Sequence, residues 1–340
     1  MDKATIFDVA AKAHVSNATV SRALNNPEMV RVETRNKVLK AAKELGYKAN
    51  AFARGLASSK STQVAIITPD LSRASVSEMV KGILSVASTY KYSSILIPSP
   101  ADEKYDDLLT DIVSSRYDGV LYLVDEITDP KYNFLKELND VYKTPFVLVN
   151  TVCSQDSKFL SVAIDYEKAG YEVTKALIDE GRKNIALFST HKRYPVSILK
   201  ENGYLKAMSE ASLTPSICYT SGNLDYNKND ITTFLDTHTV DGVIGVRDSI
   251  AIVTMNILIS RGFKVPDDVS IYGFQNTRQT LLCRPELSSV HIPIYEIGAR
   301  AMKVLTNEML GQKQETNKQI RLQHSIMKRG TTKWWNYQKI

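Results

Sequence analysis

The chain has 340 residues, 43% hydrophobic and 24% charged, a composition typical of a soluble protein with two or three domains. Its net charge of +6 lies entirely in residues 1–60, which hold 11 Lys and Arg against 5 Asp and Glu, whereas the remaining residues carry 32 of each sign. Three widely spaced cysteines without a CxxC pair argue against a disulfide framework, and no apolar run approaches the roughly twenty residues of a membrane span. Because the charged N-terminus also lacks a signal-peptide pattern, we expect a cytoplasmic protein.

The N-terminal segment predicts two short helices that cross each other. Ile6, Val9 and Ala10 follow the i, i+3, i+4 spacing of one apolar helix face. A short interruption at Val15 and Ser16 precedes a second apolar face, and Ser16 is a residue type that caps a helix N-terminus. The pattern predicts a helix-turn-helix.

The outward face of the second predicted helix suggests a function. Because Val20 and Leu24 form its apolar face, the other side chains point outward, and they are types that contact base edges or phosphates in a major groove: Asn17, Ala18, Ser21, Arg22 and Asn25. A plain solvated helix is the alternative. The local excess of positive charge favours DNA binding, since cationic side chains displace the counterions of phosphates.

A third helix and a conditional one follow. Val38, Ala42 and Leu45 predict a helix that ends at Gly46. The segment Asn50–Ser58 has the composition for about two helical turns, but it is too short to be stable alone in water, so we expect it to form only with a partner or DNA. A polar linker then leads to residue 62.

From residue 62 on, short apolar strands alternate with amphipathic helices, which indicates βαβ units on a buried parallel sheet. The strands are predicted at 64–67, 95–97, 120–124, 146–149, 162–164, 185–189, 217–220, 243–246 and 269–274. The helices are predicted near 80–87, 108–113, 134–141, 169–180, 197–211, 229–236, 249–261 and 294–309. We predict two doubly wound α/β halves, the second starting at 162, with a ligand-binding cleft between them.

Several of these motifs together resemble the LacI/GalR family of bacterial transcription regulators, from Thr5 to Thr331. The most specific are the stretch Ile6–Asn25, the run Ala53-Arg-Gly-Leu-Ala57, and Val265-Pro-Asp-Asp-Val-Ser-Ile-Tyr-Gly-Phe274. The resemblance implies a periplasmic-binding-protein-like core of two parallel-sheet subdomains with a helix-turn-helix headpiece. The corresponding boundaries are 1–48 for the headpiece, 49–61 for the hinge helix and linker, 62–161 plus 291–322 and 162–290 plus 323–331 for the two subdomains, and 332–340 for a tail.

Family membership implies a homodimer that binds a palindromic operator in double-stranded DNA. The DNA-binding positions carried over from the family are Thr5, Ser16, Asn17, Ala18, Thr19, Ser21, Arg22, Asn25, Tyr47, Asn50, Ala53 and Leu56. In the family the hinge segment enters the minor groove, and the residue at Leu56 inserts between base pairs. The tail, which contains Trp334 and Trp335, has no counterpart in the usual pattern, and we expect an exposed or dimer-contacting extension.

The expected effector cleft departs from sugar-binding relatives. Its positions are Arg73, Ala74, Lys200, Arg247, Asp248 and Gln275. Lys200 replaces an Arg and Gln275 an Asp, so a neutral sugar held by bidentate hydroxyl contacts is disfavoured. A small anionic effector is therefore one interpretation.

The other interpretation is a protein corepressor. Within the family, the sequence is most similar to the carbon-catabolite regulators of Gram-positive bacteria, which bind seryl-phosphorylated HPr. The positions carried over are Leu84, Ser88, Tyr295, Glu296, Lys303 and Thr306, although Leu84 replaces an acidic residue. No cofactor, metal site or enzyme activity is expected, because the five histidines lack metal spacing and no P-loop or GxSxG motif occurs.

Overall fold

The computed structural model describes residues 4–47, 61–68, 71, 73–102, 104–124, 126–151, 158–191, 194–222, 224–312 and 317–333. The chain divides into two compact units, Met1–Gln63 with Asp111–Asp118 and Val64–Thr110 with Gly119–Ile340. We describe the N-terminal helices, called the headpiece, separately from the α/β core.

The headpiece contains helices α1 (Ile6–Ala13), α2 (Asn17–Asn25) and α3 (Val32–Glu44), with a 3₁₀ turn η1 (Pro27–Met29) before α3. The predicted three helices are confirmed, and Gly46 after α3 has a positive φ of 64° that suits glycine. The three helices close one apolar cluster made of small and β-branched side chains: Val9, Ala10, Ala13, Val20, Ala23, Val38, Ala41 and Ala42. Small residues let the helices approach closely, so the headpiece has a core of its own.

The first sheet of the core has six strands in the order β11-β5-β4-β3-β1-β2. Their bounds are β1 Gln63–Thr68, β2 Ser93–Pro98, β3 Gly119–Leu123, β4 Phe146–Val149, β5 Ser161–Ile164 and β11 Gln319–Leu322. The registered pairs β1–β3, β3–β4, β4–β5 and β5–β11 are all parallel. The central strands are buried on both faces, as expected for a sheet covered by helices.

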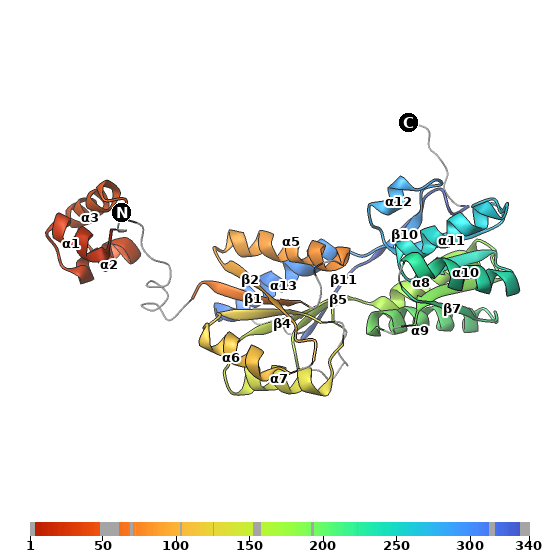
Figure 1. Ribbon diagram of the computed structural model, residues 1–340, viewed down its shortest axis with the longest axis horizontal. Coiled ribbons are helices and arrows are strands. Elements are labelled where there is room, and N and C mark those ends of the chain that lie inside the picture. The colour runs from red at the N-terminus through yellow and green to blue at the C-terminus, as the bar shows by residue number, and fades with distance from the viewer. Residues whose placement is uncertain are drawn as a thin grey trace. The chain divides into compact units, whose positions relative to one another are not determined.

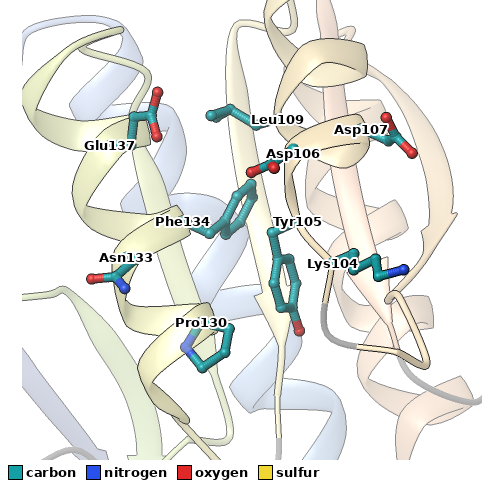
Figure 2. A pocket seen from close by; sticks show the side chains of 9 residues that line it. All are labelled: Lys104, Tyr105, Asp106, Asp107, Leu109, Pro130, Asn133, Phe134 and Glu137. Carbon is teal, nitrogen blue, oxygen red and sulfur yellow. The ribbon is translucent and has the colours of Figure 1, made fainter.

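Four helices cover this sheet: α5 (Ala74–Thr89), α6 (Asp106–Ser114), α7 (Asp129–Asp140) and α13 (Ile294–Met309). Helices α5 and α13 pack on each other, and two glycines allow it, because a Cβ at Gly82 or at Gly298 would overlap a backbone carbonyl of the facing helix. Helices α6 and α7 lie on the opposite face of the sheet (Figure 1). Side chains from both line a pocket (Figure 2).

The second sheet has the order β12-β10-β9-β8-β6-β7. Its strands are β6 Ile185–Thr190, β7 Ser216–Thr220, β8 Gly242–Gly245, β9 Ser270–Gln275, β10 Ser288–His291 and β12 Ser325–Met327, of which β12 is antiparallel to β10. Its helices are α8 (Tyr166–Asp179), α9 (Pro195–Glu210), α10 (Leu224–Thr237), α11 (Asp248–Ser260) and the short α12 (Gln279–Leu282). The predicted fold of two parallel-dominated α/β sheets with a helix-turn-helix headpiece is thus confirmed.

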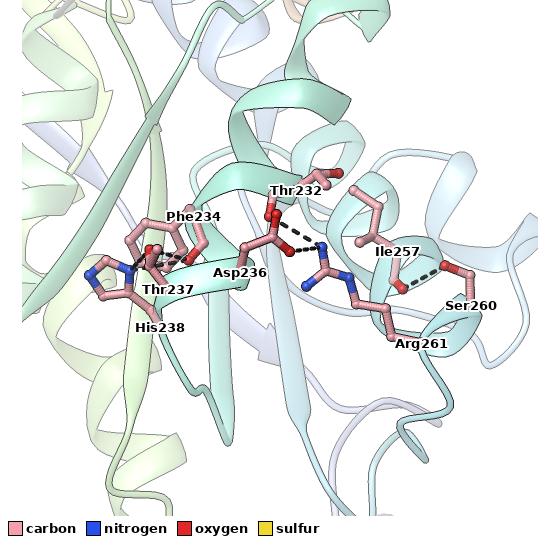
Figure 3. Close-up of polar contacts among 8 residues, drawn as sticks. All are labelled: Thr232, Phe234, Asp236, Thr237, His238, Ile257, Ser260 and Arg261. Carbon is pink, nitrogen blue, oxygen red and sulfur yellow. Dashed lines mark hydrogen bonds and ion pairs between the residues drawn. The ribbon is translucent and has the colours of Figure 1, made fainter.

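Helices α10 and α11 are tied together at their C-terminal ends. The guanidinium of Arg261 donates to the carboxylate of Asp236 at 2.7 Å and to the carbonyl of Thr232 at 3.2 Å (Figure 3). Beside this ion pair, the ring of His238 stacks on that of Phe234 with centroids 4.2 Å apart. The Arg261 contacts therefore link the C-terminal part of α10 to the end of α11.

One predicted boundary is wrong. The sequence pattern assigns the strand at 162–164 to the second half, but β5 pairs with β4 and β11 in the first sheet. The chain therefore crosses between the sheets at Asp165, which caps α8, and again between β10 and α13 and between β11 and β12. Among the described residues, no helix separates β4 from β5, so the alternation of strands and helices breaks there, one strand before the crossing to the second sheet.

Candidate functional site

The turn between α1 and α2 is set by local hydrogen bonds. The hydroxyl of Ser16 accepts from the backbone N–H of Thr19 at 3.2 Å, so Ser16 caps α2 as predicted. His14 ends α1 in the left-handed conformation with φ 53°, which redirects the chain. The result is a rigid turn that presents the N-terminus of α2, where free backbone N–H groups and the positive end of the helix dipole favour phosphate.

The N-terminus of α1 is also capped. Thr5 and Asp8 form a capping box, in which the Thr5 backbone N–H donates to the Asp8 carboxylate at 2.7 Å and the Thr5 hydroxyl accepts from the Asp8 N–H at 3.4 Å. The hydrogen bonds from Thr5 lower the pKa of the Asp8 carboxyl. Lys12 forms an ion pair with Glu44 of α3 at 2.9 Å, which ties α1 to α3.

Helix α2 presents a row of exposed polar side chains. Val20 and Ala23 are buried on its inner face, whereas four of the predicted DNA contacts are exposed on its outer face: Asn17, Ala18, Arg22 and Asn25. Ser21 is half-buried and its hydroxyl accepts from the Asn25 amide at 3.3 Å. This face combines a guanidinium, amides, a hydroxyl and a methyl group, which together suit the edges of base pairs in a major groove.

The other predicted headpiece positions have different environments. Thr5 and Ser16 are exposed and act as helix caps, and Thr19 is half-buried. Tyr47 is half-buried and packs against the headpiece core, so its ring contributes to the stability of the headpiece. Asn50, Ala53 and Leu56 lie outside the described residues.

In the core, residues from two strand–helix junctions meet around the ring of Tyr194. Arg73 precedes α5 and Arg247 precedes α11, and their guanidinium carbons lie 5.5 and 6.0 Å from the Tyr194 ring centroid. Both arginines are half-buried. The structure therefore brings two of the predicted effector residues together on one aromatic side chain, which holds each cation through its π-face.

Lys200 is buried in α9, with 4% of its surface exposed. Its ammonium group donates to the carbonyl of Val246 at 2.9 Å and lies 4.5 Å from the ring centroid of Phe274 and 5.5 Å from that of Tyr166. Burial is the main cause that lowers the pKa of Lys200 to about 7, with repulsion from Arg247 acting in the same direction. The buried amine therefore loses its proton at a lower pH than an exposed lysine does.

The remaining effector positions are mostly engaged within the protein. Asp248 is buried, its carboxylate accepts from the hydroxyl of Ser289 at 2.6 Å and from the N–H of Thr277 at 2.6 Å, and burial raises its pKa. Gln275 is half-buried with a positive φ of 105°. Ala74 begins α5, and its side chain lies outside the description.

The predicted corepressor surface lies on α5 and α13, with one correction. Five of its positions are exposed, namely Leu84, Ser88, Tyr295, Glu296 and Lys303. Thr306 is fully buried and its hydroxyl donates to the carbonyl of Met302 at 2.8 Å. A protein partner on the surface cannot reach Thr306, so that assignment is wrong.

Tyr194, Tyr166 and Phe274 are not singled out by the sequence pattern. Tyr194 follows β6 and Phe274 lies near the end of β9, the carboxyl ends where ligands of doubly wound sheets gather. A search of the carboxyl ends of the strands would have found these aromatic residues once the strand bounds were known.

The headpiece and the two-sheet core define a DNA-binding regulator with a helix-turn-helix. Residues 5–50 match the family model of bacterial regulatory proteins of the lacI family, and residues 174–332 match that of a periplasmic binding protein-like domain. Catabolite control protein A of Staphylococcus aureus is 36% identical over 334 residues, covering 97% of this chain and 99% of that protein. Its namesake from Priestia megaterium is 37% identical over 337 residues, with the same coverage. The chain belongs to the lacI family of transcription regulators.

Two solved structures extend the comparison. The transcription regulator CcpA of Lactococcus lactis is 31% identical with a TM-score of 0.68, covering 80% of this chain and 99% of that one. The lac repressor dimer bound to operator and the anti-inducer ONPF has a TM-score of 0.87 at 22% identity, covering 97% of this chain and 99% of that one. This second similarity shows that the two proteins share a fold. Within the described part of the chain, no helix has the length and apolar character needed to cross a membrane.

Proposed function

We propose that this protein is a repressor that binds a palindromic operator as a homodimer, with α2 of each headpiece in a major groove. The observation that carries the proposal is the exposed polar row of α2, held outward by a capped turn and a self-contained core. A twofold symmetric dimer reads two half-sites about one helical turn apart, which explains why the operator would be a palindrome.

The side chains of α2 suggest individual contacts. Arg22 is exposed and suits the two acceptors of a guanine edge, while Ala18 suits a thymine methyl group. Asn17 and Ser21 add hydrogen bonds to bases or phosphates. We propose that Asn50, Ala53 and Leu56 complete the interface through the minor groove, as in the family.

Exposed apolar residues support a dimer. Strand β2 is an edge strand of the first sheet, and Ile95 and Leu96 are 38% and 44% exposed. Leu281 and Leu282 of α12 are also exposed, the latter at 79%. An apolar edge strand promotes unwanted association unless it is covered, so we propose that a second copy covers both surfaces.

For regulation, we propose a corepressor protein of the seryl-phosphorylated HPr type on the α5–α13 surface. The likeness to catabolite control protein A over nearly the whole chain supports this choice. Lys303 is exposed on α13 and offers a point charge for a phosphate, beside Tyr295 and Glu296 at the start of the same helix. Binding there would bias the core toward the orientation that orders the hinge helices.

A small anionic effector is the alternative, favoured by the meeting of Arg73 and Arg247 on Tyr194 near buried Lys200. Gln275 and Asp248 would then shape the site, and Ala74 would line it.

Operator affinity of the full-length protein, measured by fluorescence anisotropy, tests these proposals. Removal of residues 1–60 should abolish binding, and unchanged binding would refute the headpiece assignment. Seryl-phosphorylated HPr and a panel of sugar phosphates are then titrated separately. A gain in affinity with phosphorylated HPr, lost in Lys303→Glu, supports the corepressor; no response to it refutes that role.

A further inference from the structure

The outer face of the first half carries a pocket of about 470 Å³ between α6 and α7. Figure 2 shows Asp106 and Leu109 on the α6 side and Asn133 and Glu137 on the α7 side, with the ring of Phe134 between the two helices. The DNA-binding face of α2 and the α5–α13 surface use none of these residues. The pocket therefore has no role in the function proposed above.

The floor of the pocket is apolar and fixed. Tyr105, Leu109 and Phe134 are nearly buried, and the rings of Tyr105 and Phe134 lie 5.2 Å apart. The hydroxyl of Tyr105 is within 3.0 Å of that of Tyr122 inside the sheet, which holds the Tyr105 ring in place. A preformed apolar floor favours one large apolar side chain from a partner, because little ordering of the pocket is needed on binding.

The rim of the pocket is acidic. Residues 102–140 contain eleven Asp and Glu against four Lys and Arg, although the chain outside residues 1–60 is neutral as a whole. Lys104, the one cation among the described residues that line the pocket, pairs with Asp102 at 3.6 Å. In the described part of the chain, Asp106 and Glu137 are exposed and make no ion pair, so both carboxylates are available to a cation.

We propose that the α6–α7 pocket is a docking site for a basic segment of a partner protein, with one large apolar side chain seated on Phe134 and Leu109. Lysine or arginine residues on both sides of that anchor would pair with Asp106 and Glu137. Groove recognition of this kind takes its specificity from the anchor and its orientation from the flanking charges.

The charge of the rim decides between occupants. A nucleic acid would be repelled by the excess of carboxylates. A second copy whose twofold axis passes through the pocket would place the same acidic rim opposite itself, which is also repulsive. A basic protein segment with a large apolar side chain matches both the acidic rim and the apolar floor of the pocket.

Isothermal titration calorimetry of the full-length protein at low salt with the peptide KKWKK tests the proposal, with EEWEE and KKGKK as control peptides. We expect KKWKK to bind, EEWEE not to bind, and KKGKK to bind about tenfold more weakly because it lacks the anchor. The double variant Asp106→Asn, Glu137→Gln should weaken KKWKK binding by about fivefold or more. The matched control Glu126→Gln, Asp140→Asn removes two exposed acids outside the pocket lining and should change affinity by less than about twofold.

Asn133→Arg adds a cation to the exposed wall and should also weaken binding, while circular dichroism checks that each variant is folded. Equal losses in the test and control pairs would overturn the proposal, since they indicate a diffuse charge effect. Equal affinity for KKWKK and KKGKK would also overturn it. If a protein ending at Lys333 binds KKWKK more tightly than the full chain, the tail of the protein itself is the occupant and the partner assignment is wrong.

Discussion

The buried amine of Lys200 makes the stability of the core depend on pH. Its pKa is about 7 in the folded protein and 10.5 when exposed, so between these values the unfolded chain binds more protons. Stability must then rise with pH across this window, at about 1.4 kcal/mol per pH unit. Below the folded pKa, Lys200 is charged in both states and the full burial penalty, roughly 5 kcal/mol, acts against folding.

Substitution Lys200→Met removes this proton linkage while keeping an unbranched side chain of similar length. The variant loses the hydrogen bond to the Val246 carbonyl, a cost of about 1 kcal/mol that does not depend on pH. The variant should be more stable than wild type near neutral pH. The difference in unfolding free energy between the variant and the wild type should decrease by about 2.7 kcal/mol between about pH 7.5 and pH 9.5, because folded wild-type protein needs no charge on Lys200 in this range.

Urea denaturation of both proteins at several pH values, followed by far-ultraviolet circular dichroism, gives the difference in unfolding free energy directly. Other titrating groups cancel in the difference between two proteins that differ only at this residue. A difference that stays constant over the window would refute a depressed pKa for Lys200.

Four further substitutions, one of them with a control substitution, test other parts of the account. Ser16→Ala should destabilise the headpiece by about 1 kcal/mol in thermal unfolding, through loss of the α2 cap, and equal melting curves would contradict the capping role. Gly298→Leu should prevent α13 from packing on α5 and leave little folded protein by circular dichroism; a normal melting transition would contradict the close approach. Leu56→Ala should weaken operator affinity by about tenfold or more with the core still folded, and unchanged affinity would contradict its insertion between base pairs. Lys303→Glu should reduce the affinity for seryl-phosphorylated HPr in calorimetry by about tenfold, whereas Thr306→Ser should not change it.

The headpiece could be predicted largely from the sequence because its information is local. The helical period places Val20 inside and Asn17, Ala18 and Arg22 outside, and the cap at Ser16 depends only on a residue three positions later. The strands β1 to β9 are likewise predicted with bounds close to those observed, because most of them are continuous apolar runs. Strands β10, β11 and β12 are not predicted.

Other features depend on distant parts of the chain. The sequence analysis places Lys200 in the effector cleft. In the structure its ammonium group lies against the rings of Tyr166 and Phe274, which come from two other elements. Thr306 is predicted at the surface, yet its hydroxyl is satisfied by the preceding helical turn and tolerates burial. The assignment of β5 to the first sheet follows from its pairing with β4 and with β11, and strand pairing is not reported by the apolar pattern of β5 itself.

The central claim is that α2 reads a palindromic DNA sequence. Selection of random duplexes by the full-length protein, followed by sequencing, tests this claim and requires no assumed operator. We expect enrichment of one palindrome, with a base preference at one position of each half-site that is lost in Arg22→Ala, at a cost of about 1–3 kcal/mol for the preferred base pair. Enrichment of no palindrome, or of the same palindrome with equal preference by the Arg22→Ala variant, would contradict the claim.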